Sequence, residues 1–293
     1  MVELLRPRAM DEAVDMMARY GGDAIVYGGG TAIQILLRQG VLAADAFVDL
    51  SLTPGLDTIA VGSDGVAAVG PMVSLKQLHT EPQLQASAPL AALAYRHAAN
   101  PRVRNTATVA GNIAHGDYRL DPPGALTTLD ASITAASVRG QRTIPAREFF
   151  VDVQLTALEP DEIVTGIRIP AQPQGAGHGY AKLSALGAND WPAASAAALL
   201  DPQPGGGWQP GHERLLRLGI GALAPTPLYL EVAVTGLSVT DAVGLAQERA
   251  GQLYDPLPDV RGSVAYKRRL GAVAIAAAVR DAWRDCTAKE AAR

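Results

Sequence analysis

The chain has 293 residues and a mass of 30.4 kDa, and its formal net charge of −4 corresponds to a pI near 5.7. Hydrophobic residues make up 48% and charged residues 18% of the chain, a balance that excludes extensive disorder and leaves room for two folded domains. The net negative charge argues against nucleic acid or an anionic membrane as the main partner.

The cysteine and histidine residues exclude further classes of site. Cys286 is the only cysteine, so it cannot form an intrachain disulfide, and alone it cannot hold zinc or an iron–sulfur cluster. The histidines show no ligand spacing, and we predict no metal site.

The first residues lack the apolar core of a signal peptide, and the most apolar helix candidate, 270–279, is too short to cross a bilayer. We therefore expect a cytoplasmic protein without a membrane span.

The first elements are predicted to be a helix, a strand, a glycine turn and a second helix. Residues 10–20 have the apolar spacing of a short helix, and 24–27 form a buried strand that leads into Gly28-Gly29-Gly30. Thr31 then opens the second helix, whose free N–H groups favour a phosphate. Position 33 is Ile where a G-x-G-x-x-G motif needs glycine, and no Walker lysine follows. A tight turn without a ligand is the alternative interpretation.

The middle of the chain is expected to complete a first domain over residues 1–170. Its short mixed elements do not form a regular βαβ series. We predict hairpins over 58–61 with 66–69 and over 131–138 with 141–144, helices over 76–79 and 83–99, and a strand over 162–169.

The stretch 100–131 is predicted to be a ligand loop. Between Thr108 and Asn112 the side chains are small, so main-chain N–H groups can approach an anion closely. Asp121 stands directly before two prolines, where its carboxylate can cap a helix or accept a hydrogen bond from a ligand hydroxyl.

Several charged and aromatic residues near this stretch allow two interpretations. Arg102 and Arg104 are either solvated charges or contacts to a pyrophosphate. Asp190-Trp191-Pro192 either lies beside the ligand or packs at a strand start. Asp117 and Arg119 are expected to be loop charges.

A linker rich in Gly and Pro, 171–177, precedes a second domain over 178–290. Strands followed by helices indicate an α+β domain, with the helices on one face of a three-stranded antiparallel sheet. We expect strands over 179–186, 193–200 and 214–221, a loop over 201–211, and helices over 228–235, 241–253 and 263–285.

Two small-residue segments together carry a family resemblance. Gly28-Gly29-Gly30-Thr31 and Thr108-Val109-Ala110-Gly111-Asn112 resemble the two flavin loops of the FAD-binding medium subunit of molybdenum hydroxylases, the relatives of xanthine dehydrogenase and carbon monoxide dehydrogenase. Segments 45–50, 221–227 and 259–269 are also similar to blocks of that family. The resemblance therefore extends over nearly the whole chain.

This resemblance implies an α+β chain with a two-subdomain FAD fold of the para-cresol-methylhydroxylase and vanillyl-alcohol-oxidase type, followed by a C-terminal α+β domain. It implies that Asp121 holds ribose hydroxyls, that Val164 borders the flavin and that Lys182 approaches it. Ala110 departs from the family by replacing a glycine, and Ala98 stands where some relatives stack an aromatic side chain on adenine. The implied FAD-binding residues are Val26, Tyr27, Gly28, Gly29, Gly30, Thr31, Ala32, Ile33, Thr108, Val109, Ala110, Gly111, Asn112, Asp121, Val164 and Lys182.

The resemblance also implies a division of labour among subunits. A large molybdopterin-binding subunit would carry out hydroxylation and a small [2Fe-2S] subunit would relay electrons. This chain would accept them on FAD and pass them to an external acceptor. A dimer of heterotrimers is the expected assembly, with no catalytic residue on this chain. A self-contained flavin oxidase of the same fold and a flavin-free interaction module are the alternatives, which an absorption spectrum would distinguish.

Overall fold

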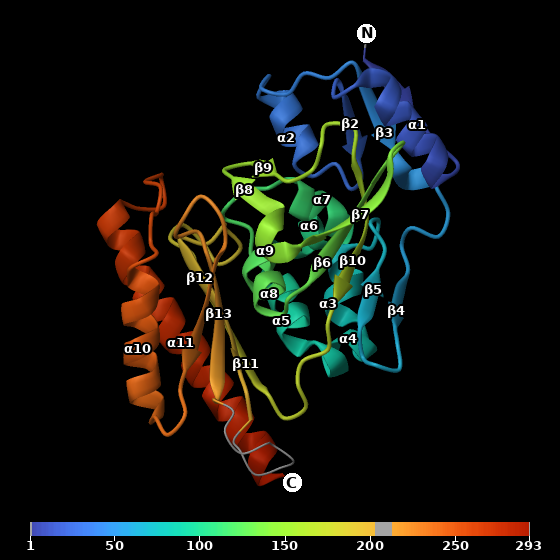
Figure 1. Cartoon of the computed structure of the whole chain (residues 1–293). Coiled ribbons are helices and arrows are strands. Elements are labelled where there is room, and N and C mark those ends of the chain that lie inside the picture. Colours follow the sequence, from blue (N-terminus) through green and yellow to red (C-terminus); the bar gives the residue numbers. More distant parts are fainter. Residues whose placement is uncertain (1, 203–212, 293) are drawn as a thin grey trace.

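The computed structural model describes residues 2–202 and 213–292, so most of the predicted loop 201–211 lies outside the described residues. Figure 1 shows a small N-terminal sheet region, a central sheet with many short helices, and a C-terminal sheet with two long helices. Within the described ranges, no helix combines the length and the apolar character that crossing a membrane requires.

The N-terminal region confirms the predicted helix, strand and glycine turn. Helix α1 (Met10–Tyr20) ends at Gly21, whose φ of 55° is the left-handed conformation typical of a helix C-cap. Helix α2 (Ile33–Arg38) begins later than expected, because Thr31 and Ala32 still belong to the turn. The parallel sheet has the order β1 (Glu3–Leu5), β3 (Ala46–Asp49), β2 (Ala24–Tyr27), and a short 3₁₀ helix (Leu50–Leu52) follows β3.

The central sheet confirms both predicted hairpins and the further strand. Its five strands have the order β4 (Ile59–Val61), β5 (Ala67–Val69), β10 (Ile163–Ile169), β6 (Ser132–Ser137), β7 (Gly140–Pro145). Strand β10 pairs antiparallel with a strand of each hairpin and so joins them into one sheet. A small separate hairpin of β8 (Phe150–Asp152) and β9 (Leu155–Thr156) precedes β10 in the sequence.

Two predictions for the helices of the central region are wrong. The expected helix over 83–99 is two helices, because Pro89 disfavours helical backbone at Ala88, whose φ is −138°. The expected ligand loop over 100–131 is mostly helical, since Asn100 and Thr108 each cap a helix with a side-chain oxygen. The helices are α3 (Leu75–Thr80), α4 (Pro82–Ser87), α5 (Pro89–His97), α6 (Pro101–Thr106), α7 (Val109–Ala114), α8 (Pro122–Thr128) and α9 (Ala146–Phe149).

The C-terminal sheet has four strands, so the three-stranded prediction is wrong. The segment expected as a helix over 228–235 is strand β14, because its residues alternate Leu228, Leu230 and Val232 with Tyr229 and Glu231 and pair along β13. The antiparallel order is β11 (Gly177–Leu183), β12 (Ala194–Leu200), β13 (Leu215–Gly221), β14 (Leu228–Ala233), and the helices are α10 (Val239–Gly251) and α11 (Val264–Ala291).

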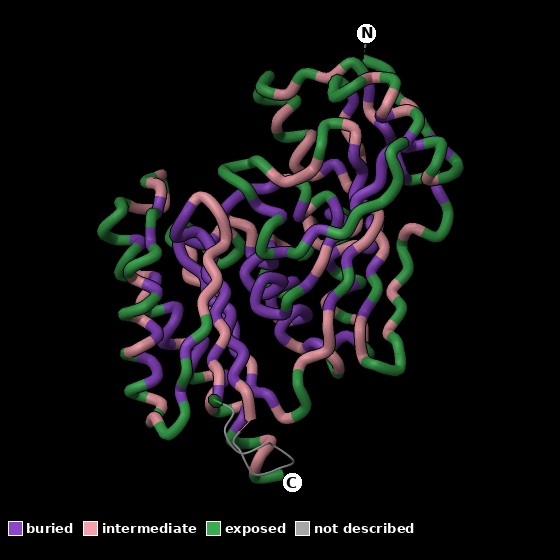
Figure 2. Tube along the Cα trace, in the orientation of Figure 1, coloured by how far each residue is buried: buried purple, intermediate pink, exposed green. Residues whose placement is uncertain are grey.

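Both faces of this sheet are covered, not one face as predicted. Figure 1 shows α10 and α11 on one side, and α5 and α8 of the central region on the other. Every residue of β12 is buried (Figure 2): Ala196 and Ala198 belong to the core with α11, whereas Ala197 and Leu199 belong to the central core. Gly219 completes the contact, since a Cβ there would lie 1.8 Å from the carbonyl oxygen of Gly124 in α8.

Candidate functional site

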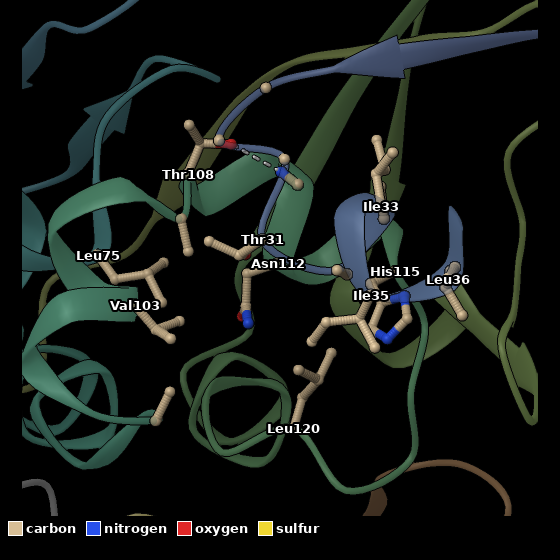
Figure 3. A pocket seen from close by; sticks show the side chains of 18 of the residues that line it. Thr31, Ile33, Ile35, Leu36, Leu75, Val103, Thr108, Asn112, His115 and Leu120 are labelled. Atoms are coloured by element: carbon tan, nitrogen blue, oxygen red, sulfur yellow. Dashed lines mark hydrogen bonds between the residues drawn. The ribbon is translucent and has the colours of Figure 1, made fainter. Parts of the chain in front are cut away.

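A cavity of about 720 Å³ lies where the N-terminal region, the central helices and the C-terminal sheet meet. Its volume is in the range of small-molecule sites, roughly 300–1,000 Å³. In Figure 3, Thr31 comes from the turn after β2 and Ile35 extends from α2 toward Leu120, while Asn112, His115 and Leu120 come from α7 and the loop that follows. Polar groups therefore project from two segments into a mostly apolar pocket.

The glycine turn is shaped by its contact with the segment between α6 and α7. A Cβ on Gly29 would lie 2.0 Å from the carbonyl oxygen of Thr106, and a Cβ on Gly28 would lie 2.7 Å from Thr108 Oγ1. Gly30 has a φ of 66°, which a residue with a side chain rarely adopts. The glycines thus allow the two loops to meet backbone to backbone at the edge of the cavity.

The second loop presents an unpaired polar atom. Thr108 Oγ1 accepts a hydrogen bond from the Gly111 N–H at 3.2 Å and so begins α7. Asn112 lines the cavity, and its Oδ1 atom is buried without a hydrogen-bond partner among the described residues. An unsatisfied buried acceptor costs about 1–3 kcal/mol, so a ligand that donates a hydrogen bond here relieves that cost.

Asp121 belongs to a buried cluster that crosses from the central region to β11. Its Oδ1 accepts a hydrogen bond from the Tyr180 hydroxyl at 2.9 Å, and its Oδ2 accepts one from Lys182 Nζ at 2.8 Å. Lys182 also donates to the carbonyl oxygen of His97. Burial raises the pKa of Asp121 to about 6, although the charge and hydrogen bond of Lys182 act to lower it. Within the described part of the chain its carboxylate makes no cap to α8, so the capping interpretation is wrong.

The structure brings most of the predicted FAD-binding residues to this one cavity. The predicted residues that line it are Val26, Gly28, Gly29, Gly30, Thr31, Ala32, Ile33, Thr108, Gly111, Asn112, Asp121 and Lys182. Of the other predicted residues, all within the described ranges, Val109, Ala110 and Val164 are buried in the central core and do not line the cavity. The Tyr27 hydroxyl accepts a hydrogen bond from Gln34 outside the cavity.

The two arginines of α6, Arg102 and Arg104, are both described and are not part of the cavity wall. Arg102 is exposed. Arg104 donates hydrogen bonds to the carbonyl oxygens of Ala98 and Ala99 at the end of α5. Arg104 therefore has a local structural partner, which its position in the sequence did not indicate.

One wall of the cavity is predicted only in part, since the sequence offers Trp191 as a possible ligand neighbour but does not indicate Asp117 and Arg119. Asp117 and Arg119 are not loop charges, because Asp117 is 2% exposed and accepts two hydrogen bonds from the Arg119 guanidinium, at 2.9 and 2.7 Å. Arg119 also stacks 4.4 Å from the centre of the Trp191 ring, and both residues line the cavity. His115 lies edge-on to the same ring, and burial is the main cause of its lowered pKa. The Asp-x-Arg spacing was the available signal for this pair.

Comparisons with known proteins agree with this geometry. Residues 1–172 match the family described as the FAD binding domain in molybdopterin dehydrogenase. The carbon monoxide dehydrogenase medium chain of Hydrogenophaga pseudoflava is 31% identical over 284 residues, which are 96% of each chain. The putative xanthine dehydrogenase FAD-binding subunit XdhB of Escherichia coli is 29% identical over 231 residues, 78% of this chain and 76% of that one.

The fold is likewise that of solved relatives. A chain of carbon monoxide dehydrogenase from Hydrogenophaga pseudoflava superposes with a TM-score of 0.90 at 30% identity, covering 97% of this chain and 98% of that one. The family match spans both loops that meet at the cavity, and the structural match extends through β11 and α11. The chain therefore belongs to the family of FAD-binding domains of molybdopterin dehydrogenases and is a flavoprotein component of an oxidoreductase.

Proposed function

We propose that this chain is the FAD-binding subunit of a multi-subunit molybdenum hydroxylase, and that it accepts electrons from a [2Fe-2S] subunit and passes them to an external acceptor. The observation that carries the proposal is the cavity beside the contact between the two loops, with Asn112, whose Oδ1 atom has no hydrogen-bond partner among the described residues, in its lining. The likeness to subunits of carbon monoxide and xanthine dehydrogenases supports the electron-transfer role.

The residues around the cavity fit FAD by their chemistry. Glycines 28–30 line the cavity without side chains that would keep a diphosphate away from the main chain, and Thr31 and Asn112 offer polar side chains. Ile33, Leu36 and Leu120 form apolar walls that exclude water. Bound FAD supplies one- and two-electron redox chemistry, while the chain binds, orients and shields it.

Asp121 fits a ribose contact even though its carboxylate already has partners. Each carboxylate oxygen can accept more than one hydrogen bond, and Tyr180 and Lys182 use one on each oxygen. Lys182 in turn places a positive charge at the cavity wall. We therefore propose that Asp121 accepts a hydrogen bond from a ribose hydroxyl and also holds Lys182 toward the cofactor.

We further propose an FAD-binding domain over 1–170, of two subdomains, and a C-terminal domain over 178–290. The end of β10 at Ile169 and the start of β11 at Gly177 support that boundary. The proposed partners are a large molybdopterin-binding subunit and a small [2Fe-2S] subunit, in a cytoplasmic dimer of heterotrimers. Relatives named as a medium chain and a medium subunit support a multi-subunit complex.

The proposal is tested on the purified full chain by absorption spectroscopy and by titration of the apoprotein with FAD and with FMN. We expect one FAD per chain and weaker binding of FMN, because FMN lacks the diphosphate that the two loops would hold. Neither loop contains Cys or His, so acid denaturation should release the flavin. A chain that binds no flavin, or that prefers FMN, would contradict the proposal.

A further inference from the structure

The segment 259–269 resembles a family block, yet none of its residues lines the cavity, although all of them are described. Three of its charged side chains are nevertheless largely buried. The Lys267 side chain is 0% exposed and donates to Asp259 Oδ1 at 2.9 Å and to the carbonyl oxygen of Leu257 at 2.7 Å. The Arg261 and Asp259 side chains are 13% and 17% exposed. Buried charges are costly unless paired, so their arrangement needs a structural reason.

Asp259 is the centre of this arrangement and receives groups from both domains. Besides Lys267, its Oδ1 accepts a hydrogen bond from the Arg261 main-chain N–H at 2.9 Å. Its Oδ2 accepts one from the Tyr118 hydroxyl at 3.3 Å and lies 3.7 Å from the Arg119 guanidinium. Tyr118 and Arg119 belong to the segment between α7 and α8, so Asp259 connects the C-terminal region to one wall of the cavity.

Arg261 connects the same centre to a second part of that wall. Its guanidinium donates to both carboxylate oxygens of Asp190, at 2.9 and 2.7 Å. Asp190 and Trp191 are adjacent in the segment between β11 and β12, and both line the cavity. Because Arg119 stacks on Trp191, the two wall segments contact each other and are held from behind by Asp259 and Arg261.

The charges in this cluster balance. Asp117, Asp190 and Asp259 face Arg119, Arg261 and Lys267 within it. Such a balanced cluster has two possible roles. The first is to join the two domains, and the second is to fix the side chains that form the cavity wall as well. Arg261 contacts Asp190 directly but does not itself line the cavity, so mutation of Arg261 can separate the two roles.

We infer that Arg261 is a positioning residue of the cofactor site, which fixes the Asp190-Trp191 segment as one wall of the cavity without touching the cofactor itself. The expected effect of Arg261 on FAD binding rests on the proposed function. The expected effect of Arg261 on the position of Trp191 does not, because it can be measured in the apoprotein. Loss of the Arg261 guanidinium frees Asp190, and the Trp191 ring, which is partly exposed in the wild type, then becomes more accessible to solvent.

The experiment compares Arg261→Gln with Arg217→Gln in the full chain. Arg217 is a matched control in strand β13 of the C-terminal sheet, because its guanidinium donates to both carboxylate oxygens of Asp201, at 2.7 and 3.3 Å. Both residues are described, and neither lines the cavity. Three quantities are measured for each variant: the melting temperature, the FAD dissociation constant and acrylamide quenching of Trp191 fluorescence in the apoprotein. The Trp191 share of the signal is the difference between each protein and the same protein carrying Trp191→Phe.

We expect Arg261→Gln to increase quenching of Trp191 and to raise the FAD dissociation constant about tenfold. Arg217→Gln should lower the melting temperature comparably while changing neither of the other quantities. Arg261→Lys should give an intermediate result, because an ammonium reaches one carboxylate oxygen where a guanidinium reaches two. If Arg261→Gln does not fold, Asp190→Asn, which keeps the shape and removes the charge, should show the same increase in quenching.

Unchanged Trp191 quenching in Arg261→Gln, or an equal increase in Arg217→Gln, would overturn the inference. Unchanged FAD affinity in a variant with exposed Trp191 would also overturn it, since the wall would then not serve the cofactor. A wild-type chain that binds no FAD would instead refute the proposed function, a result visible before any variant is made.

Discussion

Lys182 and Asp121 form an ion pair at 2.8 Å in which the two side chains are only 4% and 5% exposed. Lys182 lies on the C-terminal sheet and Asp121 directly before α8. The pair thus joins two regions of the chain at the wall of the cavity. Each side chain neutralises the buried charge of the other, which would otherwise be unpaired.

The first prediction concerns this pair. Asp121→Asn and Lys182→Gln should each lower the free energy of unfolding, by about 3 kcal/mol, because each leaves one buried charge without its partner. The double variant should lose less than the sum of the two, since neither charge then remains. Chemical denaturation of the four proteins gives the coupling energy. Strictly additive losses would show that the two side chains do not act as a pair.

The second prediction separates binding from stability at Asn112. Asn112→Ala removes a buried acceptor that has no partner among the described residues, so the apoprotein should melt at the same or a higher temperature. FAD affinity should fall about tenfold, because a hydrogen bond to the ligand is lost. Asn105→Ala, at an exposed position of α6, should change neither quantity. A less stable apoprotein with normal FAD affinity would assign Asn112 a purely structural role.

The third prediction concerns space in the cavity. A Cβ on Gly111 would meet only Thr108 Oγ1, at 3.0 Å, so Gly111→Val should fold with a small loss of stability. The branched side chain enters the cavity beside Asn112, and FAD binding should be abolished. Gly244→Val in α10 is the matched control, because a Cβ there has no neighbour within 4 Å. Isothermal titration with FAD checks both variants, and tight binding by Gly111→Val would exclude close contact at this point.

The fourth prediction is a pH dependence from His115. Burial lowers its pKa below the ordinary value of 6.5, with the Arg119 charge acting in the same direction and the Asp117 charge opposing both. As pH falls through 6.5 the unfolded chain gains a proton before the folded chain does. The contribution of neutral His115 to stability is therefore present above pH 6.5 and is lost below it.

The measurement is the difference in unfolding free energy between the wild type and His115→Gln, from about pH 7.5 to about pH 5. The wild type should lose stability relative to the variant as the pH falls. Taking the difference removes the titration of Asp121, whose raised pKa has the opposite effect in the same range. A flat difference would mean that His115 titrates normally in the folded chain.

Much of the fold could be predicted where the signal is local. The helix at Met10–Tyr20 and both hairpins of the central sheet follow from apolar spacing and turn residues. Strand β14 was misassigned because six mostly apolar residues are compatible with a helix or a strand, and only pairing with β13 decides between them. The covering of both sheet faces also depends on contacts with α5 and α8, which no local pattern encodes.

The site divides in the same way. The glycine turn and the segment from Thr108 to Asn112 carry compact motifs, so most of their predicted residues could be placed in advance. The stacking of Arg119 on Trp191 could not, because the two residues are distant in the sequence and Asp259, which is distant from both, comes near Arg119 only through the fold. Val164 was assigned by comparison with relatives, whereas its side chain is packed in the central core.

Burial of both faces of β12 limits where the chain can be divided into fragments that fold separately. The family match ends at residue 172, before the sheet that covers α5 and α8. A fragment cut there would present the apolar surface around Ala125 and Leu126 to water, and the remaining sheet would present Ala197 and Leu199. Each half therefore needs a partner surface that covers these residues, and we expect either half expressed alone to expose apolar surface and to aggregate.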